Sequence, residues 1–221
     1  MGAKRDGRHW LWLNGLSLVM FGSFLIFLVL QSVFGWQANN NELADFGRPA
    51  LAYWDYVLSG DFGEQTFENW ESEFLQMGSY VLLTAFLVQK GSPESNPLDG
   101  YKDPESRPHP DAPAPVKRGG WVLKLYENSL GLALIGMFLL SFTLHLLTGT
   151  AAYNDQQSLH GKPPVGVGEF LGSSEFWSQS MQNWQSEFLA VGVLIVFTIF
   201  LRQRNSAQSK NVAEPHHETG A

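Results

Sequence analysis

The chain carries nearly the same sequence twice, and this duplication constrains its fold more than any single motif does. Residues 11–97 and 125–211 align without a gap at an offset of 114 residues. Within them the segment Asn69–Leu75 returns as Asn183–Leu189, with one glutamate replaced by glutamine. A fixed internal period indicates a fold assembled from similar units. We therefore expect two copies of one structural unit that stand next to each other.

Long apolar runs indicate that the repeated unit is a membrane hairpin. Gly15–Gly35 has 21 residues without a charge, and in Leu130–Leu147 only His145 can ionise. A helix of 21 residues covers about 31 Å, the thickness of the hydrocarbon core. The first run could resemble a signal peptide, but its counterpart at 130–147 cannot be one, so we expect both to be retained. We predict an all-α membrane protein of four spans, at about 14–36, 68–90, 127–149 and 182–203.

Positive charges predict the orientation of these spans. Twelve of the 14 Lys and Arg residues lie in the two terminal tails and in the segment between the second and third spans, leaving only Arg48 and Lys162 elsewhere. Cytoplasmic loops carry the excess of such residues. We therefore expect both termini in the cytoplasm and the loops 37–66 and 150–180 outside. Two spans per repeat then give both repeats the same orientation, as a parallel duplication.

The polar segments divide the chain into folded and mobile parts. The linker is rich in proline and the tail is polar, so neither composition can bury a core. Ser59 and Ser173 are each followed by an acid two residues later, which is typical of helix starts, and we expect helices from about 61 to 90 and from about 175 to 203. The predicted parts are the tail 1–10, repeat 1 at 11–90, a disordered linker at 91–120, repeat 2 at 121–204 and a disordered tail at 205–221.

Two repeated carboxylates are the main candidates for a functional site. The run Phe74–Val88 and its counterpart are too short to cross a bilayer alone, so Glu73 and Glu187 should lie near or inside the outer hydrocarbon. Ionisable residues at that depth are costly and therefore suggest function. Gln31 and its counterpart His145 are expected at a similar depth. Further candidates are Asn69 and Asn183 on the same helix faces, a secondary stripe of Thr84, Thr198 and Tyr80, and Trp70 and Trp184 as interface anchors.

Three interpretations of this polar cluster remain open. The residues could hydrogen-bond across helices and fix how the repeats dock. They could form a cation or proton pathway in which Glu73 and Glu187 carry charge and His145 exchanges protons. The two glutamates could also simply extend to the headgroup region. The first interpretation predicts a non-enzymatic membrane component that acts through helix–helix or partner contacts, and the second predicts a small proton or cation channel or transporter.

Composition and motifs exclude several other classes of protein. A net charge of −7 argues against a nucleic-acid partner, and the absence of cysteine excludes disulfides and thiolate metal sites. The sequence has no metal-ligand spacing, nucleophile elbow or phosphate-binding glycine loop, so we expect neither an enzyme nor a cofactor. The expected partners are the lipid bilayer and either a second copy of the chain or another membrane protein.

Four segments resemble a family of bacterial membrane proteins that is known only as a domain of unknown function. These segments are Asn14–Leu18, Asn69–Met77, Gln182–Gly192 and Phe200–Arg204. The duplicated element Asn-Trp-[Glu/Gln]-Ser-Glu-Phe-Leu is the most specific of them. The resemblance covers most of the chain and implies a protein of the bacterial cytoplasmic membrane. It implies no activity, substrate or cofactor.

Overall fold

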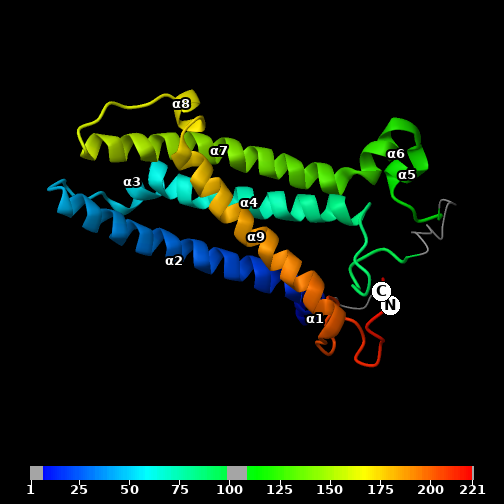
Figure 1. Ribbon diagram of the computed structural model, residues 1–221. Coiled ribbons are helices and arrows are strands. Elements are labelled where there is room, and N and C mark those ends of the chain that lie inside the picture. The colour runs from blue at the N-terminus through cyan, green and yellow to red at the C-terminus, as the bar shows by residue number, and fades with distance from the viewer. Residues whose placement is uncertain (1–6, 99–108, 221) are drawn as a thin grey trace.

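The computed structural model describes residues 7–98 and 109–220, and every regular element in this part of the chain is a helix. The four longest contain 31, 25, 31 and 27 residues; α2, α4 and α7 run roughly along one direction, and α9 crosses them obliquely (Figure 1). In chain order the helices are α1 (Gly7–Leu13), α2 (Gly15–Asp45), α3 (Tyr53–Val57), α4 (Gly60–Thr84), α5 (Ala114–Arg118), α6 (Gly120–Glu127), α7 (Ser129–Leu159), α8 (Val167–Leu171) and α9 (Ser174–Phe200).

Three of the described helices, and not the four that we predicted, are long and apolar enough to cross a membrane. These are α2, α7 and α9, so the chain is a multi-pass membrane protein by length and composition. The exception is α4, the predicted second span. Its outer half carries Asp61, Glu64, Glu68, Glu71 and Glu73, and it ends at Thr84, short of the predicted end near residue 90. Its carboxylates are costly to place in hydrocarbon, which is why α4 does not qualify alone.

Capping serines set the starts of α4 and α9, as the sequence predicted. The hydroxyl oxygen of Ser59 accepts a hydrogen bond from the Phe62 amide at 3.5 Å, and that of Ser173 accepts one from the Phe176 amide at 3.2 Å. Both helices then begin one residue later. These caps satisfy amide groups that have no partner within the helix.

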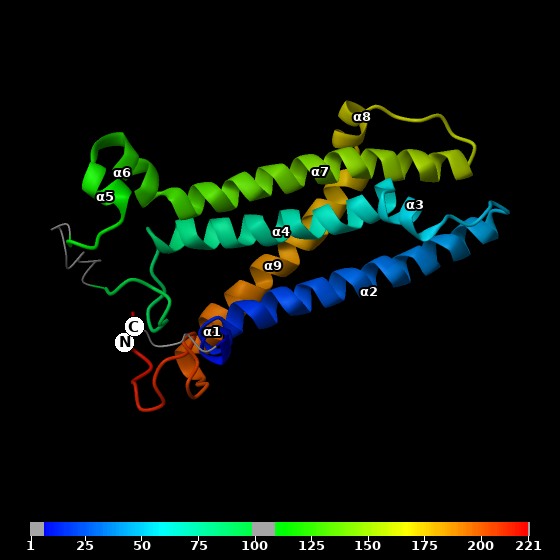
Figure 2. The ribbon, with the colours of Figure 1, turned by 180° about the vertical axis from the view of Figure 1, so that it is seen from behind.

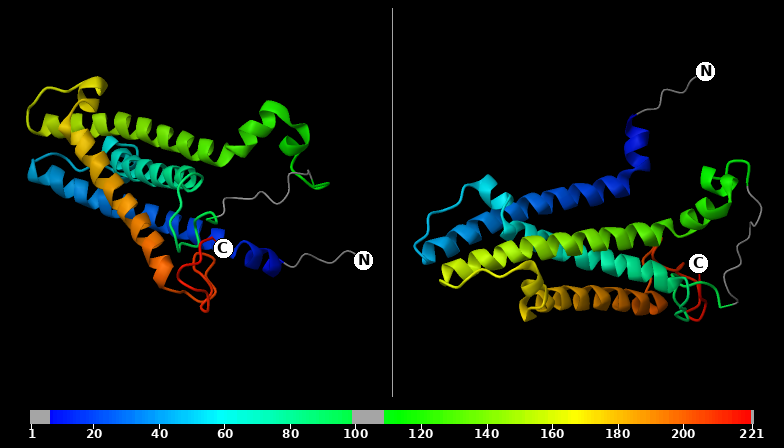
Figure 3. Two further views of the ribbon diagram at one scale, coloured as in Figure 1. Left: turned by 45° about the vertical axis from the view of Figure 1, so that its right-hand side comes forward. Right: turned by 90° about the horizontal axis from the view of Figure 1, so that it is seen from above.

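The four long helices form a layered assembly in which α4 and α7 are the most closely packed pair. Seen from above in Figure 3, α2 and α9 flank this pair on opposite sides. Helix α1, the segment after α9 and α5–α6 lie at one end of the long helices, whereas the loops that carry α3 and α8 lie at the other (Figures 1 and 2). We call these the inner and outer ends.

An asparagine near the outer end of each long first helix holds the loop that follows it. The side chain of Asn40 accepts from the Leu51 amide at 2.7 Å and donates to the Leu51 carbonyl at 3.1 Å. Asn154 makes the same two bonds with Val165, at 2.7 and 3.0 Å. Each loop is therefore fastened to its helix across 11 residues by a pair of bonds that mimics a strand pairing.

The linker and the tail contain more structure than we predicted. The described part of the linker 91–120 includes α5 and the start of α6, while residues 99–108 lie outside the described residues. In the tail, residues 205–220 fold back to the end of α4, where the Gly91 amide donates to the Thr219 hydroxyl at 2.8 Å. The Lys210 ammonium is only 4% exposed because it donates to carbonyl groups at 215–218.

Candidate functional site

A buried ion-pairing couple, Glu71 of α4 and His145 of α7, forms the centre of the site. Glu71 Oε2 and His145 Nδ1 are 2.8 Å apart, and both side chains are fully buried. The close packing of α4 on α7 brings them together, since a side chain at Gly63 would collide with Thr148 of α7 and one at Gly78 would be in tight contact with Ile135. A buried carboxylate is retained only when it is paired and hydrogen-bonded.

Helix α9 supplies the remaining contacts to this couple. The Trp184 indole Nε1 donates to Glu71 Oε1 at 2.8 Å, so each oxygen of the carboxylate has a donor. The ring of Phe176 stacks on the His145 imidazole, with ring centroids 4.8 Å apart and an interplanar angle of 29°. The couple thus holds three helices together, and apolar aromatic surface closes it off from solvent.

The Gln179 side chain extends the network from His145 toward the outer end. Its Nε2 donates to Glu64 Oε1 at 3.0 Å, which leaves its Oε1 facing His145 Nε2 at 3.4 Å. An amide oxygen only accepts, so this orientation of Gln179 suits a proton on His145 Nε2. An ionised Glu71 likewise suits a proton on His145 Nδ1. The orientation of Gln179 therefore favours a doubly protonated His145 beside an ionised Glu71.

Glu68 is the second carboxylate next to His145. Its Oε2 lies 4.0 Å from His145 Nε2, and its side chain is 21% exposed. On a helix, residues 64, 68 and 71 share one face, so three carboxylates descend along α4 toward the imidazole. This row joins the buried couple to the outer surface.

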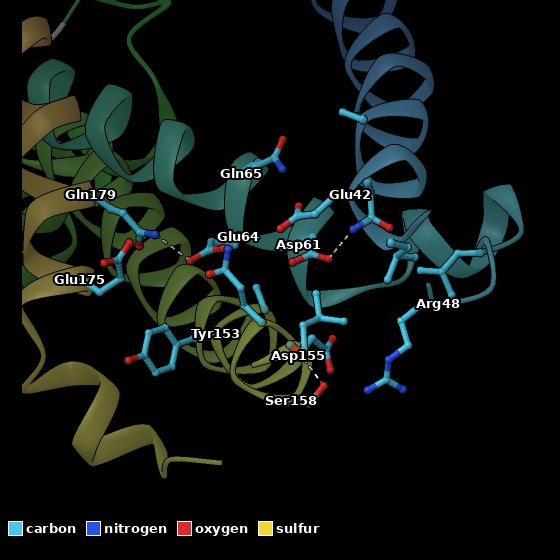
Figure 4. A pocket seen from close by; sticks show the side chains of 18 of the residues that line it. Glu42, Arg48, Asp61, Glu64, Gln65, Tyr153, Asp155, Ser158, Glu175 and Gln179 are labelled. Carbon is cyan, nitrogen blue, oxygen red and sulfur yellow. Dashed lines mark hydrogen bonds between the residues drawn. The ribbon is translucent and has the colours of Figure 1, made fainter. Parts of the chain in front are cut away.

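The row opens into an acidic vestibule of about 660 Å³ at the outer end. Carboxylates from all four long helices line it, with Arg48 as the basic residue on its wall (Figure 4). In the described part of the chain, no three acidic or histidine side chains converge as metal ligands. The vestibule is therefore suited to hydrated cations and protons rather than to a tightly held metal. The lining carboxylates are Glu42, Asp61, Glu64, Asp155 and Glu175.

Burial and mutual repulsion make the vestibule carboxylates easier to protonate. Burial raises the pKa of Glu64 to about 7, with smaller increases from Glu68 and Asp61, while the hydrogen bond from Gln179 and the charge of His145 lower it. Burial also raises the pKa of Asp61, and Asp155 and Glu42 add to this rise. Carboxylates of this kind exchange protons near neutral pH.

The predicted pair Glu73 and Glu187 is not at the centre of the site. Glu73 is exposed on α4, and Glu187 is half-buried on α9, whereas we expected both to turn toward protein. Asn69 is exposed and donates to the Gln65 carbonyl at 2.6 Å, and half-buried Asn183 donates to the Gln179 carbonyl at 3.3 Å. The reason is helical phase, because Glu71 rather than Glu73 faces α7.

The other predicted residues are divided between the site and the inner end. His145 is at the centre, whereas its counterpart Gln31 lies half-buried on α2. The hydroxyl groups of Thr84 and Thr198 bond within their own helices, at 2.9 Å to the carbonyls of Tyr80 and Ile195. The Tyr80 hydroxyl donates to Glu94 at the inner end.

The two predicted interface tryptophans have different environments. Trp70 packs against Phe24 of α2, with ring centroids 5.8 Å apart, and against Phe67. Trp184, in contrast, contributes the indole donor to Glu71 described above. Its role in the site was not predicted, because a tryptophan near a membrane interface is most often an anchor.

Glu71 was not predicted from the sequence, because the prediction favoured residues that are identical in both repeats. Glu71 aligns with Gln185, and His145 aligns with Gln31. Both members of the ionisable couple therefore differ from their counterparts, and both counterparts are glutamine. The signal available in the sequence was that both residues differ from their glutamine counterparts. A buried carboxylate and a buried imidazole are stable only as a pair, so the two differences are expected to occur together.

Comparison with known proteins adds a family but no function. No curated protein matches the chain, and no solved structure does. One family profile matches residues 7–221, which is nearly the whole chain. Its description is that of a domain of unknown function. The chain therefore belongs to the DUF6766 family, a domain of unknown function.

Proposed function

We propose that the protein is a bacterial cytoplasmic-membrane component made of two tandem hairpins, with both termini in the cytoplasm. The internal sequence offset of 114 residues supports the duplication, because α2 and α7 begin and end at positions related by that offset. The matched asparagine bonds in the two outer loops add to this support. The position of twelve Lys and Arg residues supports the orientation.

In this arrangement α4 enters the bilayer with the help of its neighbours. The part of α4 from Glu68 to Thr84 is not apolar enough to cross alone, but it packs along α7, a candidate span. Its carboxylate Glu71 is buried against α7 and α9 rather than presented to lipid. Polar residues in membranes are tolerated when they face protein in this way.

The function that the geometry supports best is non-enzymatic exchange of a proton between the outer medium and the Glu71–His145 couple. One observation carries this proposal: a fully buried imidazole contacts Gln179, which lines an acidic vestibule at the outer end, and lies 4.0 Å from the partly exposed carboxylate of Glu68. The proton on His145 Nε2 moves to a Glu68 carboxylate oxygen, and from there to water at the surface of the protein. His145 then remains neutral, with its Nδ1 proton still directed at Glu71.

The hydrogen bonds around the couple lead toward the outer end. In the described residues, no hydrogen-bonded chain continues from Glu71 toward the inner end, and the hydroxyl of the neighbouring Ser72 donates to the Asn69 carbonyl at 2.8 Å. We therefore propose a site that binds a proton from outside and transmits the change to α4, α7 and α9, rather than an open channel. Loss of the His145 charge weakens the contact that holds these helices together.

The test is a pH titration of His145 by solid-state NMR in liposomes, with histidine labelled with ¹⁵N. The chain has six histidines, so His145→Gln identifies the signal. We expect a His145 signal that changes from doubly to singly protonated between about pH 5 and pH 9. Glu71→Gln should move this change to lower pH, and Glu73→Gln, on the exposed side of α4, should leave it unchanged. A signal that keeps one protonation state over the whole range would refute proton exchange.

A second candidate is a purely structural role for the couple, and the Trp184 contact favours it. Trp184, Glu71 and His145 belong to three different helices and could act only to fix helix docking. In that case Glu71→Gln destabilises the assembly while the titration of the native protein shows no proton exchange. The liposome experiment therefore separates the two candidates.

A further inference from the structure

Gln31 is a polar residue without a partner in the middle of an apolar helix. It lies half-buried on α2, and no hydrogen bond in the described part of the chain involves its side chain. Two apolar residues close to it on α2, Leu30 and Phe34, are exposed. An amide in hydrocarbon stabilises an assembly when it finds a hydrogen-bond partner on another helix. Gln31 therefore marks a face of α2 that should be covered by protein.

The duplication indicates which residue would cover it. His145 occupies the position of Gln31 in the second repeat, and it pairs with Glu71 of α4. The counterpart of Glu71 is Gln185 of α9, which is exposed and whose Nε2 donates at 3.3 Å only to the nearby Gln182 carbonyl. Two glutamine side chains can donate to and accept from each other, so Gln31 and Gln185 are chemically complementary.

A glycine contact on the same faces supports this pairing. Gly78 of α4 packs so closely on α7 that a side chain there would lie 3.1 Å from Ile135 Cδ1. The counterpart of Gly78 is Gly192 of α9, which has nothing within 4 Å of its Cβ position. The counterpart of Ile135 is Phe21 of α2, which is 70% exposed. Helices α2 and α9 therefore carry the counterparts of the residues that pack α4 against α7, and these counterparts are exposed.

These two faces cannot meet within one chain as it is folded. Helices α2 and α9 share no more than a marginal contact, and they flank the α4–α7 pair on opposite sides (Figure 3). We propose that α2 of one copy docks against α9 of a second copy, with Gln31 against Gln185 and Phe21 over Gly192. The proposal rests on the duplication that we infer above.

The contact would repeat from copy to copy. Because the two faces lie on opposite sides of the chain, the interface is heterologous, and it links copies into a ring where the rotation between them closes and into an open row where it does not. At the outer end, Trp177 and Phe34 replace the closely packed pair Gly63 and Thr148. The two helices should therefore approach most closely at the inner half, around Gly192.

Cysteine crosslinking in native membranes tests the proposal directly, because the chain has no cysteine of its own. One chain with Phe21→Cys is coexpressed with a differently tagged chain with Gly192→Cys, and the membranes are oxidised. We expect a disulfide that joins the two tags. The double variant in a single chain should give a ladder of dimers and larger species. No crosslink between tags, or only an intrachain product from the double variant, overturns the proposal.

Matched controls define what counts as a crosslink. Gly78→Cys with Ile135→Cys should form an intrachain bond, because these residues are in contact. Ile26 and Ala190 lie on the faces of α2 and α9 opposite to Phe21 and Gly192, so Ile26→Cys and Ala190→Cys should not crosslink between chains. Adding Gln31→Leu to the test pair should lower its yield roughly three- to tenfold, as loss of one interhelical hydrogen bond implies.

The crosslinking result can be distinguished from the result of the proton-exchange experiment. The Gln31→Leu variant keeps Glu71, His145 and Trp184, so its His145 titration should match that of the native protein. If crosslinking fails while His145 still titrates, only the docking proposal is wrong. If the crosslink forms while His145 keeps one protonation state, the docking stands and the proton proposal is wrong.

Discussion

At the scale of single residues, the chemistry of this protein depends on the joint environment of one carboxylate and one imidazole. Glu71 accepts from both His145 and Trp184, so its charge is fully hydrogen-bonded although it is shielded from solvent. Removing either partner from such a couple leaves an uncompensated buried group. Its members should therefore behave as a unit under mutation.

A double-mutant cycle on the couple measures this dependence. We expect Glu71→Gln and His145→Gln each to lower the free energy of unfolding by about 1–3 kcal/mol, because each leaves a buried polar group poorly matched. The double variant places glutamine at both positions, as the counterparts Gln31 and Gln185 already do. It should lose less than the sum of the two single losses, by about 0.5–3 kcal/mol. Unfolding in mixed micelles with a graded denaturing detergent measures this, and strict additivity would contradict it.

A pH-dependent stability should arise from Glu64. Its pKa in the folded protein is about 7, against a usual value of 4.5, so the folded state binds more protons between these two pH values. Stability is therefore greatest below about pH 4.5 and falls as the pH rises toward 7 and beyond. Glu64→Gln, which keeps an acceptor for Gln179, should raise Tm by a few °C at pH 8 and leave it unchanged near pH 4. Equal shifts at both pH values would argue against this cause.

At the scale of elements, the paired asparagines show how each hairpin is closed at its outer end. Asn40 and Asn154 each bind both backbone groups of one loop residue, so the loop direction is set before the capping serine starts the next helix. The loops position α4 and α9, and α4 in turn positions Glu64, Glu68 and Glu71. The site therefore depends on loop closure about 20 residues away in sequence.

Asn154→Ala should disturb this closure. It removes both bonds to Val165, and we expect a loss of about 1–3 kcal/mol of stability and faster hydrogen exchange of the loop 160–166. Asn40→Ala should have the same effect on its own loop, which makes each variant the matched control of the other. Unchanged exchange in the loop next to the substitution would show that the asparagine does not hold it.

At the scale of the whole molecule, the arrangement of helices decides which surfaces meet lipid, water and protein. The loops, with the acidic vestibule, lie at one end, and the chain termini lie at the other. Three apolar helices flank α4, whose residues Glu71, Ser72 and Gln76 are buried. This segregation is what permits a buried ion pair in a membrane protein of only 221 residues.

Single cysteines test the orientation of the whole chain. We expect Ala112→Cys, in the linker, to react with an impermeant maleimide only after the cells are opened. Gln156→Cys, near the vestibule, should react in intact cells because it is exposed at the outer end. The reverse pattern would place the vestibule in the cytoplasm and reverse the direction of proton access.

The sequence by itself determined the elements of this protein, and the tertiary structure decided the site. Apolar length specified α2 and α7, capping serines specified where α4 and α9 begin, and His145 was recognisable as an ionisable residue in an apolar run. These are local properties of backbone and side chain. The partner of His145 was not predictable in the same way, because Glu71 and Glu73 lie two residues apart and only the rotation of α4 against α7 selects between them. The same rotation makes Trp184, an expected interface anchor, a hydrogen-bond donor to Glu71. The role of a side chain on a helix face depends on which residues of the neighbouring helix it contacts, and the sequence of one helix does not specify these.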